Sequence, residues 1–145
     1  MRQLFMLITT LVLLVACTSA TETPAGCQPS KIQTSPNGFR EIQGDMSSEG
    51  ELWALLFFET AHANEEVKIV WRITGEGDGF EAQAQSEQGA ILQPIWKQYH
   101  EGSNWQRPGQ EWGTGFNFPE SGCWTITVTH GETTGTISLD VSASP

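Results

Sequence analysis

The chain has 145 residues, with 17 Asp and Glu against 7 Lys and Arg, and its formal net charge is −10. The length allows one ordinary domain, and six Trp with seven Phe supply enough bulk for a hydrophobic core, which excludes wholesale disorder. The acidic charge argues against a nucleic-acid partner, because phosphate backbones require a basic surface, and against attachment to anionic lipid by surface charge alone.

The chain opens with a short basic start, Met1–Gln3, followed by a mostly apolar run, Leu4–Val15. This run is too short for a transmembrane helix, which takes about 20 apolar residues, but it fits the hydrophobic region of a secretory signal. Its end, Leu14-Val15-Ala16-Cys17, resembles the lipobox of bacterial lipoproteins. The resemblance implies cleavage before Cys17, a diacylglycerol on its thiol, often a further acyl chain such as palmitate on the new amino terminus, and anchoring to a membrane on its extracytoplasmic side, in the bacterial cell envelope. An ordinary signal peptide followed by a chance Cys is the alternative.

We therefore expect three segments: a signal peptide (residues 1–16), the lipidated Cys17 with a flexible tether (residues 17–30), and a folded domain (residues 31–145). Residues 18–26 contain no large apolar side chain, which is typical of a linker. Two further cysteines remain, Cys27 and Cys123. In an oxidising compartment they are most simply a disulfide, with two buried free thiols or a reactive thiol as the alternatives.

Past the tether, the pattern is that of β-strands. Residues 67–74 alternate apolar and polar side chains, and residues 123–129 and 136–141 do the same around a Gly-containing loop, which predicts a C-terminal antiparallel hairpin. Residues 52–58 are apolar on both faces, which favours a central strand. Weaker patterns predict strands within residues 31–34, 80–85 and 116–118. About seven short strands predict an all-β fold, an immunoglobulin-like antiparallel β-sandwich, with a small barrel or jelly roll as the alternative.

Four segments resemble bacterial secreted and lipoprotein domains of immunoglobulin-like fold: residues 52–57, 67–75, 102–116 and 118–124. The likeness covers residues 49–141. It implies the sandwich and export, and it carries over no biochemical activity.

The unusual segment is residues 94–115, which places three Trp and one Tyr among polar side chains, Gly and Pro. Because Pro and Gly disfavour a continuous helix or central strand, we expect much of it to be an ordered loop. Two interpretations stay open: a recognition surface for a glycan or a protein, or aromatic side chains that cap the end of the sandwich, with Arg107 and Glu111 forming an ion pair. The candidate binding residues are Trp96, Tyr99, His100, Asn104, Trp105, Arg107, Glu111 and Trp112.

Motifs for catalysis, metals or cofactors are not apparent. His62, His100 and His130 are expected in loops and lack the spacing of metal ligands, and residues 75–79 fit a Gly-rich hairpin turn better than a phosphate or calcium loop. The sequence therefore favours a lipid-anchored, non-catalytic binding or assembly module that needs no cofactor. A small envelope enzyme or metal carrier is the alternative.

Overall fold

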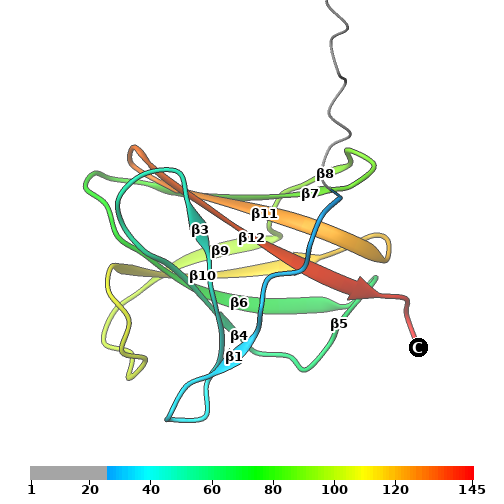
Figure 1. Cartoon of the computed structure of the whole chain (residues 1–145), viewed down its shortest axis with the longest axis horizontal. Helices are drawn as coiled ribbons and strands as arrows, with labels where there is room; N and C mark the ends of the chain where they lie inside the picture. Colours follow the sequence, from blue (N-terminus) through cyan, green and yellow to red (C-terminus); the bar gives the residue numbers. More distant parts are fainter. Residues whose placement is uncertain (1–25) are drawn as a thin grey trace, which may run out of the picture.

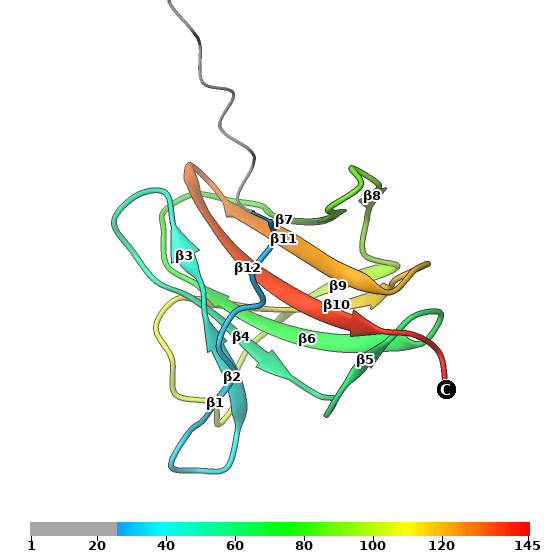
Figure 2. The same ribbon diagram turned by 45° about the vertical axis from the view of Figure 1, so that its right-hand side comes forward.

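The structure is a computed structural model that describes residues 26–145. The predicted signal peptide and Cys17 lie outside these residues. Within residues 26–145, twelve strands form two sheets that pack face to face (Figure 1, Figure 2), which confirms the predicted antiparallel β-sandwich. This range holds no helix that is long and apolar enough to cross a membrane.

We call the two layers sheet A and sheet B. Sheet A contains, in spatial order, β1 (Gln33–Thr34), β2 (Arg40–Gln43), β4 (Leu52–Leu56), β6 (Glu66–Ile73), β10 (Gln110–Asn117) and β9 (Trp96–His100). Sheet B contains β3 (Asp45–Met46), β12 (Thr133–Ser142), β11 (Gly122–His130), β7 (Phe80–Ser86) and β8 (Ile91–Leu92). A further strand, β5 (Ala61–His62), pairs with β12 in parallel, whereas the other pairs are antiparallel.

Alternating side chains of the long strands build the core between the sheets, as period-two patterning requires. From β6, Ile69 and Trp71 are fully buried there, and from β11 so is Trp124. Strand β4 is buried on both faces, as predicted, because Leu52, Ala54 and Leu56 join this core while Trp53 and Leu55 belong to a second apolar cluster. That second cluster lies on the other side of sheet A.

The C-terminal hairpin is confirmed, with β11 paired to β12 from Gly122↔Val141 to His130↔Thr133. Its turn is shorter than expected, because only Gly131 and Glu132 lie between the strands. The three histidines were wrongly placed in loops: His62, His100 and His130 each end a strand. His130 is fully buried, and its Nδ1 lies 2.7 Å from the carbonyl oxygen of Gly79.

The segment of residues 94–115, much of which was expected to be an ordered loop, is irregular over only half of its length. The other half forms the antiparallel pair β9 and β10, and residues 101–109 connect the two strands as an ordered loop. Both prolines, Pro94 and Pro108, lie outside the strands. Within β10, Gly115 is covered by the Trp96 ring of the neighbouring strand, so its missing side chain leaves no gap.

The number of strands exceeds the seven predicted because β2 and β9 were missed, together with three strands of two residues each, β3, β5 and β8. Two of those short strands cover the outer edge of β12: β3 pairs at Gly135 and β5 at Val141. Between them, the backbone amide of Ser30 donates a hydrogen bond to the carbonyl oxygen of Ser138, and the Ser30 hydroxyl accepts one from the Ser138 amide. The edge of β12 is therefore covered by three separate segments, an arrangement that prevents pairing with another chain.

Cys27 and Cys123 form the predicted disulfide, with their Cα atoms 5.8 Å apart. Because Trp124 points into the core, Cys123 points to the opposite side, which is the outer face of sheet B. Residues 27–30 are thus held against sheet B, whereas the tether was expected to run to residue 30. The described chain starts at this outer face, close to β7 in both views (Figure 1, Figure 2).

Candidate functional site

The face of sheet A turned away from sheet B collects most of the candidate residues, and we call it the A face. Side chains reach it from alternate positions of the strands, which are the positions not directed into the main core. These side chains are Glu41 and Gln43 from β2, Trp53 and Leu55 from β4, Glu66, Lys68, Val70 and Arg72 from β6, Glu111 from β10, and Trp96, Gln98 and His100 from β9.

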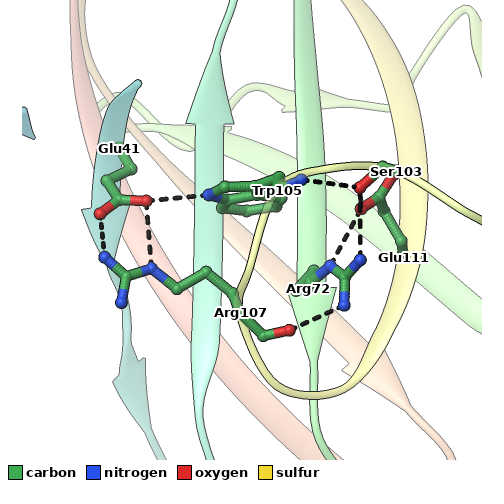
Figure 3. A network of polar contacts seen from close by, with 6 residues as sticks. All are labelled: Glu41, Arg72, Ser103, Trp105, Arg107 and Glu111. Carbon is green, nitrogen blue, oxygen red and sulfur yellow. Dashed lines mark hydrogen bonds and ion pairs between the residues drawn. The ribbon is translucent and has the colours of Figure 1, made fainter. Parts of the chain in front are cut away.

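The loop of residues 101–109 folds back over part of the A face (Figure 3). Trp105 from this loop is only 2% exposed and packs with Trp53, Leu55 and Val70. Burial of an aromatic side chain of this size stabilises the loop strongly, because such side chains remove about 150–250 Å² from water. This geometry agrees with the capping interpretation for Trp105, although the cap lies on a sheet face and not at the end of the sandwich.

A buried carboxylate anchors the loop from the other side. Glu41 is 1% exposed and accepts hydrogen bonds from Trp105 Nε1, at 2.9 Å, and from two nitrogens of Arg107. The Arg107 guanidinium also lies over the Trp53 ring, 3.7 Å from its centroid. Burial raises the pKa of Glu41, but the hydrogen bonds and charge of Arg107, with the hydrogen bond from Trp105, outweigh it and hold the pKa below its ordinary value.

A second ion pair holds the other end of the loop. Glu111 is 6% exposed and accepts hydrogen bonds from Arg72 Nε, at 2.9 Å, and from the hydroxyl of Ser103. Arg72 also donates to the carbonyl oxygen of Arg107 at 2.7 Å. The predicted ion pair between Arg107 and Glu111 is therefore wrong, because each residue pairs with a strand residue instead (Figure 3).

Beyond the loop, four residues form one register row across the A face. The backbone amide of Phe57 donates to the carbonyl of Lys68, Lys68 is opposite Gly115, and Gly115 is opposite Trp96. We call these four residues the Phe57–Trp96 row. Phe57 is 57% exposed, and the Lys68 ammonium lies 4.6 Å from the centroid of its ring. The row is thus an uncovered part of the A face with aromatic side chains at both ends.

Two of the candidate residues point to the other side of sheet A. Trp112 stacks on Phe80 of sheet B, with ring centroids 5.1 Å apart, and is part of the core lining. Tyr99 packs against Trp112 at 5.0 Å and stays 44% exposed at the open side of the sandwich. Asn104 is exposed on the loop. A shallow hollow beside the loop brings Tyr99 and His100 near the Arg72–Glu111 pair.

The eight candidate residues therefore do not form one surface, and several partners were missed. Arg72 was placed on the polar face of its predicted strand, and that placement could have suggested a partner for an acidic loop residue. Glu41 carried no such signal, because its strand was not predicted. Phe57 and Lys68 were assigned to strands without a functional role.

The chain matches no known protein family, and a search of curated proteins finds no relative. Among the described residues, no group of three or more His, Cys, Asp or Glu side chains is arranged to hold a metal ion. Function therefore has to be inferred from the A face itself.

Proposed function

We propose that this protein is a lipid-anchored module of the bacterial cell envelope whose A face binds a ligand or another protein without catalysing a reaction. The lipobox-like end of the apolar run, with Cys17, supports export and anchoring. The disulfide between Cys27 and Cys123 suits the oxidising compartment that export would provide.

The observation that carries the proposal is the position of the A face relative to the point where the chain enters the domain. The chain enters at Cys27, on the outer face of sheet B. The A face is the opposite side of the sandwich, as both ribbon views show (Figure 1, Figure 2). A lipid attached upstream of Cys27 would therefore leave the A face directed away from its attachment point and open to partners.

The charges of the two faces support the same assignment. Of the seven Lys and Arg side chains in the chain, Lys68, Arg72 and Arg107 reach the A face. The long strands of sheet B, β7, β11 and β12, contain no Lys or Arg. Arg72 and Arg107 are already paired with Glu111 and Glu41, whereas Lys68 belongs to none of the ion pairs within residues 26–145 and supports binding of a polar or anionic group at its own part of the A face.

Mass spectrometry of the protein purified from its native host tests the anchor. We expect a mature chain that begins at Cys17 and carries acyl chains, found in the membrane fraction. The Cys17→Ser variant should keep residues 1–16 or lose the lipid mass. A wild-type protein with residues 1–16 still attached, or without acyl chains on that sulfur, would contradict the proposal.

Titration of the purified protein with divalent metals tests the binding role against a metal-carrier role. We expect no tight uptake. Uptake of one metal ion at micromolar concentration would favour the carrier instead.

A further inference from the structure

We infer that the Phe57–Trp96 row is a binding site for an acidic saccharide, a sugar chain with a carboxylate on or beside the stacked ring. This inference rests on the proposed function, because it names the ligand class for the same A face. The row combines two aromatic rings, an ammonium and a glycine, and a separate observation supports each component.

The first observation is the alignment of the row. Its four residues lie at matching positions on adjacent strands, which are spaced about 4.8 Å apart. The Trp96 ring lies over Gly115, and the backbone of Gly115 is two strand spacings, about 10 Å, from that of Phe57, with Lys68 at the position between them. That distance corresponds to alternate rings of one sugar chain.

The second observation is that the Trp96 ring is held in place. Trp96 Nε1 donates to Glu66 Oε1 at 2.6 Å, and the ring covers Gly115. A Cβ atom at position 115 would lie 2.2 Å from Trp96 Nε1 and 2.9 Å from Glu66 Oε1, so only glycine permits this placement. Because the ring is fixed before any ligand arrives, stacking costs little side-chain entropy.

The third observation is the exposure of Phe57. Its side chain is 57% exposed, more than that of any other large hydrophobic residue within residues 26–145. Phe57 directly follows β4, whose five residues are all buried. Flat aromatic faces stack on the C–H faces of sugar rings, which are also flat and apolar, so an exposed ring beside polar groups favours a saccharide.

The fourth observation selects an acidic sugar. Four ion pairs occur within residues 26–145, and they occupy Arg40, Arg72, Lys97 and Arg107. Lys68 belongs to none of them and instead lies over the Phe57 ring. An ammonium that has no carboxylate partner and lies against one of the two rings favours a ligand that supplies the carboxylate.

The test measures binding by calorimetry, with the full-length processed protein in detergent. The probes are a panel of oligosaccharides containing uronic, sialic or muramic acid, each with a neutral counterpart. We expect at least one acidic member to bind more tightly than about 1 mM, and its neutral counterpart to bind about tenfold more weakly. Lys68→Met should remove this difference, whereas Trp96→Ala and Phe57→Ala should weaken both ligands about tenfold or more.

Two matched controls come from the same chain. Tyr99→Ala removes an exposed aromatic ring from the opposite side of β9, and Lys31→Met removes a lysine from outside the row. Both should bind as the wild type does. Gly115→Ala should weaken binding while every stacking side chain remains, because it displaces the Trp96 ring; thermal unfolding checks that this variant is folded.

The inference is overturned if no acidic member of the panel binds, or if the row variants bind as tightly as the controls. Capture of a protein partner that the same row variants lose would also overturn it, while leaving the proposed envelope-binding role intact. Failure of the lipidation test, in contrast, contradicts the proposed anchor and leaves the calorimetric result unaffected.

Discussion

Replacing Trp105 with Ala should destabilise the protein by about 3 kcal/mol, within the range of about 3–5 kcal/mol for truncation of a buried aromatic residue. Trp105 is 2% exposed among Trp53, Leu55 and Val70, and its indole N–H donates to the buried carboxylate of Glu41. We expect the lower end of the range, because a surface loop can move to fill part of the space. For a domain of this size, the loss corresponds to a decrease in Tm of about 10–15 °C.

Urea unfolding followed by circular dichroism measures this loss, with Trp96→Ala as the matched control. Trp96 is also a tryptophan on the A face, but it is only half-buried, so its truncation should cost less than about 1.5 kcal/mol. If Trp105→Ala were no more destabilising than Trp96→Ala, the loop would not depend on the buried indole. The account of the loop as a cap on sheet A would then be refuted.

Three further changes have defined outcomes. Cys27→Ser should cost about 4–5 kcal/mol, because the disulfide to Cys123 closes a loop of 96 residues; calorimetric unfolding measures it, and an unchanged Tm would contradict it. The pKa of Glu41 is lowered in the folded state. Its ionised carboxylate therefore contributes fully to the free energy of unfolding above the ordinary pKa of 4.5, and this contribution is lost as the pH falls through the lowered pKa. Glu41→Gln should therefore flatten the acid side of the stability profile, and an equally steep profile would exclude Glu41 as its source. Lys97 is a charged residue on the edge strand β9, and it forms an ion pair with Glu81. Lys97→Val should cause concentration-dependent association in sedimentation velocity, whereas a monomeric variant would show that this edge is protected otherwise.

The elements that could be predicted from the sequence are those with a strong local pattern. Residues 67–74 and the C-terminal hairpin alternate because one face of each strand is buried, and the structure has these strands where expected. Strand β2 was missed for a physical reason. Its Glu41 is buried only because Trp105 and Arg107 supply hydrogen bonds, and Trp105 is 64 residues away in the chain. A local pattern treats an isolated glutamate as exposed.

The candidate site shows the same limit. Trp96, Trp105 and Trp112 lie in one short segment, yet they occupy an exposed row, a buried cap and the core lining. What separates them is the strand register and the return of the loop over sheet A. Both depend on residues such as Glu41 and Arg72, which lie outside the segment. The segment could therefore be recognised as unusual from sequence, but its division into three roles could not.

The covered edge of β12 has a consequence for the order in which the chain folds. Met46, Ser30 and Ala61 all contact this last strand, across separations of 80 to 108 residues. A growing chain that has not yet reached residue 133 has nothing for these segments to pair with, so they stay unpaired until synthesis is nearly complete. Because contacts between such distant residues form slowly, on the millisecond-to-second scale, sheet B closes only after the last strand has been made.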